Sequence, residues 1–118
     1  MIGAYRRGPK IILSLPGWSE PLDVEFTIDT GFEGELSLPP HLARQIAGDD
    51  GGMQSVRLAT GLTVAADFYS VEIEWHGAGR IIEMLVLEGN PLLGLDLMRG
   101  SLLSVAMEEG GDVSIEPL

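Results

Sequence analysis

Hydrophobic and polar residues alternate with a period of two along much of the chain. The clearest run covers residues 22–29, in which every second residue is apolar: Leu22, Val24, Phe26 and Ile28. Such alternation is typical of a β-strand with one buried and one exposed face. We therefore expect Phe26 and Ile28 to point into a core, and Asp29 to project from the opposite face where the strand ends.

Several other segments have strand-like patterns. We expect strands at residues 56–58, 62–65, 71–75, 81–87, 102–107 and 113–115. Glycine and proline interrupt them at residues 16–17, 39–40, 48–52, 61, 77–79, 89–91 and 110–111. Many short strands with closely spaced turns predict an all-β domain of the barrel or sandwich type.

Helical signals are few. Residues 41–47 follow Pro39-Pro40 and end before Gly48, which predicts a short helix with a glycine stop, and residues 95–99 are a second candidate. A weak internal echo links residues 26–31 with residues 84–94, because each runs from a strand into a glycine-bearing apolar turn and then to a helix candidate. Coincidence among β-rich segments explains this echo equally well.

The composition narrows the range of functions. The chain has 118 residues, of which 45% are hydrophobic, and residues 1–118 are expected to form a single domain. It contains no cysteine, which excludes thiolate catalysis, and its two histidines, His41 and His76, lie far apart in the sequence. Gly77-Ala78-Gly79 lacks the third glycine and the helix of a dinucleotide site. We therefore expect neither a metal ion nor a cofactor.

The charge argues against several partners. The net charge is −11, from 18 acidic and 7 basic residues. Such a chain repels phosphate backbones and anionic lipids, so we expect no nucleic acid and no membrane as partners. No stretch approaches the roughly 18 apolar residues that span a bilayer, and residues 1–10 lack the apolar part of a secretory signal. The expected localisation is cytoplasmic.

Asp29-Thr30-Gly31 is the candidate for chemistry. The aspartate closes the alternating strand, the Thr30 hydroxyl can bond a nearby backbone group, and Gly31 lets the chain turn where a side chain would collide. A carboxylate held in this way can take a proton from water. The same residue types are also common in ordinary turns, so the triplet alone fits either interpretation.

The order of three elements gives the triplet a context. The first element is residues 26–34, which contain the triplet and are followed by Leu36-Ser37-Leu38-Pro39. The second is the hairpin-like segment of residues 56–64. The third is Leu92-Leu93-Gly94, about sixty residues after the triplet. Together, from about residue 22 to residue 107, they resemble the retropepsin-like aspartic proteases, in particular their small bacterial single-domain relatives. The resemblance implies a closed barrel of short strands with one or two short helices, which assembles as a twofold dimer.

The resemblance also implies roles for the triplet. Each chain of the dimer would give one such loop to a shared cleft. Asp29 would be the catalytic aspartate, Thr30 would bond across to the partner's loop, and Gly31 would let the substrate backbone approach. The apolar Leu92-Leu93-Gly94 would lie beneath this loop, with Asp96 on the short helix after it.

The hairpin and the residue after the triplet are the expected substrate-binding elements. Thr60, Gly61 and Leu62, at the tip of the hairpin, would cover a bound peptide. Phe32 departs from the family, in which a small residue usually follows the triplet. A bulky side chain there could narrow the cleft or change which peptides fit.

The chemistry implies a homodimer. Two carboxylates a few Å apart share one proton, so the ionised one can take a proton from water while the protonated one polarises the scissile carbonyl. The chain contains no second triplet of this type, and an isologous dimer would supply the second Asp29. The monomer is then expected to be inactive, and residues 1–15 and 113–118 are expected to contribute to the interface.

Three functions stay open at this point. The preferred one is an aspartic endopeptidase that acts on peptide or protein substrates. The second is a non-catalytic peptide-binding or dimerisation module on the same fold. The bulky Phe32 after the triplet is compatible with this alternative. The third is an unrelated small β-barrel in which the triplet occurs by chance.

Overall fold

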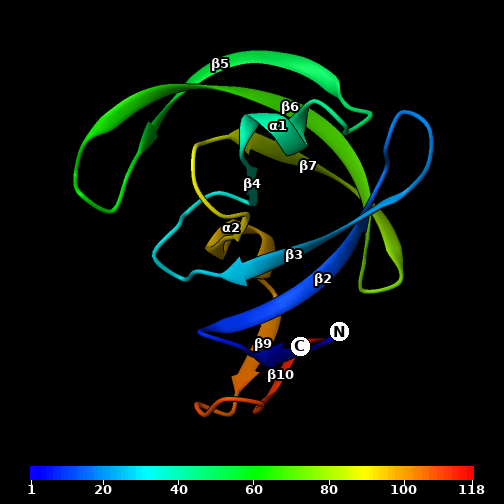
Figure 1. The fold of residues 1–118 in the computed structure, drawn as a ribbon, viewed down its shortest axis with the longest axis vertical. Coiled ribbons are helices and arrows are strands. Elements are labelled where there is room, and N and C mark those ends of the chain that lie inside the picture. The colour runs from blue at the N-terminus through cyan, green and yellow to red at the C-terminus, as the bar shows by residue number, and fades with distance from the viewer.

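Ten strands form one mixed sheet in the computed structural model, which describes residues 1–118 (Figure 1). The strands are β1 (Ile2–Tyr5), β2 (Pro9–Leu15), β3 (Leu22–Ile28), β4 (Leu36–Leu38), β5 (Asp49–Arg57), β6 (Thr63–Trp75), β7 (Ala78–Val86), β8 (Leu92–Leu93), β9 (Ser101–Val105) and β10 (Asp112–Pro117). Two short helices, α1 (Pro40–Ala43) and α2 (Leu95–Met98), complete the fold. Neither is long and apolar enough to cross a membrane. The prediction of a mostly-β fold with two short helices is confirmed.

The sheet is not closed into a barrel, and the prediction of a closed barrel is wrong. The strand order is β5-β6-β7-β4-β8-β3-β2-β1-β10-β9, so β5 and β9 are open edges. Closure requires the two edge strands to pair. Here β5 and β6 form a ribbon that arches away at one end of the molecule, while β9 and β10 lie at the other end (Figure 1).

The strand boundaries differ from the expected ones where tertiary pairing overrides the local pattern. The expected strands at residues 62–65 and 71–75 fall in one continuous strand of 13 residues, β6, except that Leu62 lies in the turn before it. Residues 49–52 were expected to break the chain, yet they belong to β5, where a bulge between Asp50 and Gly52 accommodates the glycines. The helix expected at residues 41–47 is shorter and is found at Pro40–Ala43.

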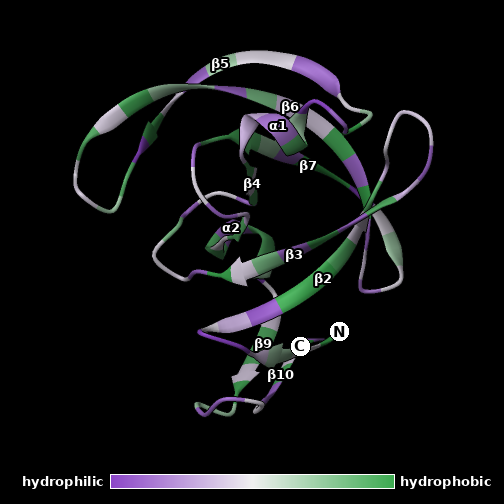
Figure 2. Ribbon diagram, in the orientation of Figure 1, coloured by the Kyte–Doolittle hydropathy of each residue, from purple (hydrophilic) through white to green (hydrophobic).

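The main core is built from β2, β3, β4, β6, β7, β8, β10 and the two helices. Strands β2 and β3 pair along six residue positions, and each buries every second side chain. Phe26 of β3 is completely buried, in agreement with the alternating pattern. Figure 2 shows β2 as largely hydrophobic, whereas β5 carries mainly polar and small residues. The core therefore fixes β3, and with it the position at which Asp29 leaves the sheet.

The internal echo in the sequence corresponds to a structural repeat. The succession β3-β4-α1 returns as β7-β8-α2. The short strand of each unit pairs in parallel with the long strand of the other, β4 with β7 and β8 with β3. The two short strands pair with each other in antiparallel fashion. Because each short strand pairs with the long strand of the other unit, neither unit can complete its hydrogen bonding alone.

The chain termini pair within the chain. Strand β1 lies between β10 and β2, and the backbone N–H of Ile115 donates to the Met1 carbonyl at 2.9 Å. The beginning and the end of the chain are thus adjacent in the sheet. Their expected part in a dimer interface stays a prediction.

Candidate active site

The Asp29 loop, residues 29–35, begins directly after β3. The Asp29 backbone N–H donates to the Leu93 carbonyl at 2.9 Å, so the residue is tied to β8 as it leaves the sheet. Its carboxylate Oδ1 accepts the Gly31 N–H at 2.9 Å, and its carbonyl accepts the Phe32 N–H at 3.1 Å. Asp29 is half-buried, whereas Thr30 and Gly31 are exposed. The turn therefore orients a carboxylate that solvent can reach.

The Leu92 segment, residues 92–96, supports this loop along its length. The Leu95 N–H donates to the Phe32 carbonyl at 2.8 Å, and the Gly94 N–H donates to the Glu35 carbonyl at 2.8 Å. The Asp96 N–H is shared between the carbonyls of residues 33 and 34, both at 3.2 Å. The two segments are distant in the sequence but form one hydrogen-bonded unit in the structure.

The expected hairpin is formed by β5 and β6. Its turn, residues 58–62, is closed by the Leu58 N–H, which donates to the Leu62 carbonyl at 2.8 Å, and by the Gly61 N–H, which donates to the Leu58 carbonyl at 2.9 Å. Gly61 has φ +88°, a conformation that favours glycine. Thr60, Gly61 and Leu62 are all exposed at this tip.

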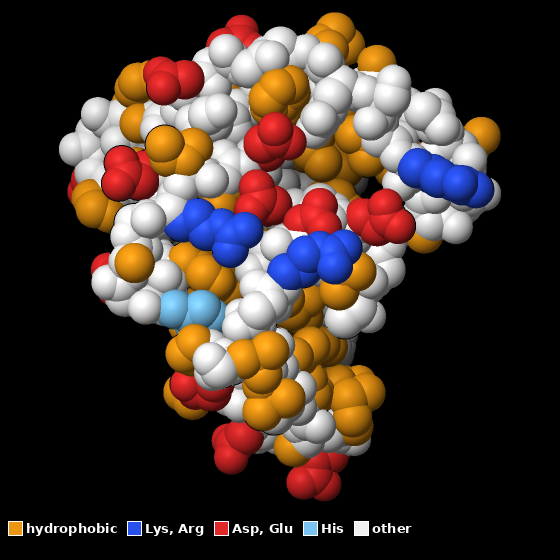
Figure 3. All heavy atoms as spheres, turned by 180° about the vertical axis from the view of Figure 1, so that it is seen from behind, with side chains coloured by type: hydrophobic (Ala, Val, Ile, Leu, Met, Phe, Trp, Pro, Cys, Tyr) orange, Lys and Arg blue, Asp and Glu red, His pale blue; other side chains and the backbone are white.

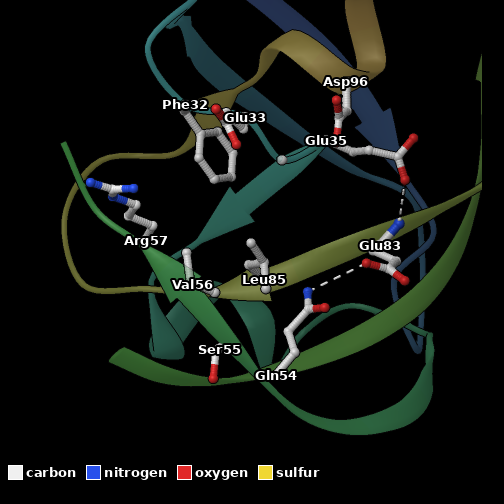
Figure 4. A pocket seen from close by; sticks show the side chains of 11 residues that line it. Phe32, Glu33, Glu35, Gln54, Ser55, Val56, Arg57, Glu83, Leu85 and Asp96 are labelled. Atoms are coloured by element: carbon white, nitrogen blue, oxygen red, sulfur yellow. Dashed lines mark hydrogen bonds between the residues drawn. The ribbon is translucent and has the colours of Figure 1, made fainter. Parts of the chain in front are cut away.

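A pocket of about 260 Å³ lies between the Asp29 loop and the hairpin strand β5 (Figure 4). It is lined by Phe32, Glu33, Gly34, Glu35, Gln54, Ser55, Val56, Arg57, Glu83, Leu85 and Asp96. Its apolar wall consists of Phe32, Val56 and Leu85, and most of the other side chains are polar or charged. Figure 3 shows acidic and basic side chains gathered across the middle of one face of the molecule.

The residues predicted for the site lie in three separate places, and the structure does not bring all of them together. Phe32 lines the pocket, whereas Asp29, Thr30 and Gly31 lie in the preceding turn, outside the pocket lining. The tip residues 60–62 lie beyond the end of β5 and also outside that lining. The structure thus places Phe32 between the Asp29 loop and the hairpin strands, and leaves the hairpin tip projecting.

Phe32 joins the loop to the part of the hairpin near its turn. Its half-buried side chain packs against the small core cluster of Val56, Ala66 and Leu85. This cluster is separate from the main core. The aromatic ring therefore contributes to the packing of the loop as well as to the wall of the pocket.

Sequence reasoning missed the polar contacts behind the pocket. Glu35 forms an ion pair with Arg80 at 2.9 Å, and Gln54 donates to the Glu83 carboxylate at 3.3 Å. Arg80 and Glu83 come from β7, more than forty residues after the Asp29 loop. The carboxylates of Glu33 and Glu35 were visible beside the triplet, but no sequence spacing indicates their partners.

The structural repeat does not place a second aspartate at the position equivalent to Asp29. The Asp29 N–H bonds the Leu93 carbonyl of β8, and in the other unit the Leu87 N–H bonds the Leu38 carbonyl of β4 at 3.0 Å. Leu87 is therefore the residue at the position equivalent to Asp29. A pair of Asp29 carboxylates requires a second chain.

A comparison of this chain with protein-family models, curated proteins and solved structures finds no match.

Proposed function

We propose that the chain is an aspartic endopeptidase that works as a homodimer and hydrolyses peptide bonds in extended segments. The observation that carries this proposal is the position of Asp29. Its carboxylate follows a core strand, is oriented by the Gly31 N–H, and belongs to a loop that is hydrogen-bonded to the Leu92 segment. A rigidly supported carboxylate at a strand end is suited to acid–base catalysis.

The proposed reaction uses one Asp29 from each chain. The ionised carboxylate takes a proton from a water molecule as the water oxygen attacks the scissile carbonyl carbon. The protonated carboxyl donates a hydrogen bond to the carbonyl oxygen, on which negative charge develops. The tetrahedral intermediate then loses its C–N bond, and the leaving amine receives a proton from the dyad. The products are a carboxylic acid and an amine.

Two observations support a dimer. The residue equivalent to Asp29 in the structural repeat is Leu87, which cannot supply the second carboxylate. The sheet also has an open edge at β9, near which Leu102 and Met107 are exposed by 56% and 74%. Figure 3 shows hydrophobic side chains covering much of the lower part of the molecule. A second copy that covered this region would remove apolar surface from water.

The other open edge supports an extended peptide as substrate. Strand β5 pairs only with β6, so its second side is free to accept another strand. Residues 54–57 of β5 also line the pocket. A peptide that added to this edge would gain main-chain hydrogen bonds and place side chains into the pocket.

The direct test is a peptide-library assay between acidic and neutral pH, with the dimer mass measured in parallel. Cleavage by the wild type that depends on Asp29 supports the proposal. A strictly monomeric protein that still cleaves peptides would contradict the shared site.

Mixing of chains gives a sharper prediction. An excess of Asp29→Asn chains is expected to inhibit the wild type, because mixed dimers contain only one ionisable Asp29. With equal amounts of the two chains and free exchange, about one quarter of the dimers would be entirely wild type. The initial rate, measured after equilibration at several ratios, should follow the square of the wild-type fraction. A rate linear in that fraction would indicate that each chain acts alone.

The hairpin tip gives a second prediction. Leu62 is 65% exposed, so Leu62→Ser is expected to leave the melting temperature unchanged. If the tip covers bound peptide, the lost apolar contact should raise KM by about three- to tenfold, with a smaller effect on kcat. Ile81→Ser is the matched control, because Ile81 is 72% exposed on β7, outside the hairpin and outside the segments expected at the dimer interface. Equal KM values for the two variants would show that Leu62 does not contact the substrate.

The second candidate is a non-catalytic peptide-binding module. It is favoured by the pocket, whose wall includes the bulky Phe32 and whose lining does not include Asp29. In that case neither the wild type nor Asp29→Asn would cleave peptides, and both would bind them saturably with similar Kd values.

A further inference from the structure

Glu35 makes three polar contacts at the end of the Asp29 loop. Its carboxylate Oε2 accepts from Arg80 Nη2 at 2.9 Å. Its Oε1 accepts the Glu83 backbone N–H at 3.0 Å, as Figure 4 shows. Its carbonyl accepts the Gly94 N–H at 2.8 Å. The Glu35 side chain is only 19% exposed. One residue therefore joins the Asp29 loop to β7 on one side and to the Leu92 segment on the other.

The strand register explains why a carboxylate is needed. Strands β4 and β7 begin to pair at Leu36 and Met84, so Glu83 lies one residue before the ladder. Its N–H has no strand carbonyl on that side, because the chain before Leu36 leaves the sheet to form the Asp29 loop. The Glu35 carboxylate takes the place of that carbonyl. An unsatisfied N–H is avoided, and the loop is held against β7.

We propose that Glu35 is the positioning residue of the Asp29 loop. The inference rests on the proposed function. The Leu93 carbonyl fixes the loop where it begins, and Glu35 fixes it where it ends. In a twofold dimer any displacement of the loop occurs in both chains, so the separation of the two Asp29 carboxylates changes by up to twice that displacement. The anchor thereby sets the geometry on which the shared proton depends.

The contacts determine which substitutions the anchor tolerates. In Glu35→Gln the amide NH₂ replaces one of the two accepting oxygens and meets either Arg80 or the Glu83 N–H, both of which are donors. Arg80→Lys keeps a cation beside Glu35, whereas Arg80→Met removes it. The expected order of activity is therefore wild type, Arg80→Lys, Arg80→Met and Glu35→Gln.

The experiment compares these variants in the full chain with two independent readouts. The first is amide hydrogen exchange at Glu83 and Gly31. The second is kcat, KM and the pH profile of kcat/KM for a peptide that the wild type cleaves. The matched control is Glu72→Gln, which changes an exposed carboxylate on β6, outside the Asp29 loop and outside the pocket lining.

In Glu35→Gln, protection of the Glu83 amide is expected to fall about tenfold or more. The kcat value should fall roughly 10- to 100-fold, with a smaller change in KM, because a displaced loop affects the reaction more than peptide binding. The two limbs of the pH profile should shift relative to each other, which a merely structural role would not produce. Glu72→Gln should leave all these quantities unchanged.

The possible failures are distinguishable. Wild-type exchange and kinetics in both Glu35→Gln and Arg80→Met would overturn the positioning role. A wild type that cleaves no peptide would refute the proposed function. In that case, faster exchange at both Glu83 and Gly31 would still establish Glu35 as the anchor of the loop, and unchanged exchange would refute it. If Glu35→Gln fails to fold, Arg80→Met decides the question by the same measurements.

Discussion

Asp29→Asn is expected to lower kcat/KM for peptide hydrolysis by roughly 10⁴-fold or more, because it removes both members of the proposed dyad at once. An amide cannot take a proton from water. The asparagine Oδ1 can still accept the Gly31 N–H, so the turn and the fold should persist. The rate should be measured with a peptide substrate, and the melting temperature and dimer mass of the variant should equal those of the wild type.

Asp50→Asn provides a closely matched control. Asp50 Oδ1 accepts the Gly52 N–H at 2.8 Å, which is the same two-residue contact that Asp29 makes with Gly31. Asp50 lies in β5, outside the Asp29 loop, so its substitution tests the local turn chemistry without changing the proposed dyad. It should retain wild-type activity. Cleavage that persists undiminished in Asp29→Asn would end the dyad hypothesis.

The part of the site encoded by local pattern could be predicted from the sequence. The alternation in residues 22–29 gave the correct strand and the correct burial of Phe26, since a period of two assigns every side chain to a face. The hairpin around Gly61 was also predictable, because a glycine between two alternating segments specifies a turn. The internal echo proved to be a real repeat.

The rest depended on pairing between distant segments. Strands β4 and β8 have three and two residues, too few for a periodic signal, and they exist because each pairs with a long strand of the other unit. Strands β1 and β2 were not predicted either. Ile11, Leu13 and Leu15 alternate in burial, but the apolar Ile12 between the first two breaks the alternation of apolar and polar residues. The Glu35–Arg80 ion pair joins residues 45 positions apart, and no local rule indicates it.

Gly94→Ala is expected to disrupt the support of the Asp29 loop. A Cβ atom at Gly94 would lie 2.1 Å from the Gly34 carbonyl oxygen and 2.7 Å from that of Phe32. Both contacts are with backbone, which cannot rotate away as the end of a side chain can. The loop and the Leu92 segment must then separate, with loss of the Gly94–Glu35 and Leu95–Phe32 hydrogen bonds. We expect a loss of about 2–3 kcal/mol in the free energy of unfolding.

Thermal and chemical denaturation would measure this loss, and Gly79→Ala is the control. A Cβ atom at Gly79 would meet only the carboxylate of Glu72, at 2.8 Å for Oε1 and 3.8 Å for Cδ, and this flexible side chain can move aside. Gly79→Ala should therefore be as stable as the wild type, since alanine also reduces the conformational freedom of the unfolded chain. If Gly94→Ala were equally stable and equally active, the close approach of the two segments would not be what holds Asp29 in place. Because Gly94 approaches Phe32 and Gly34, which both line the pocket, a loss of activity in this variant would report on the displacement of the loop together with its pocket wall.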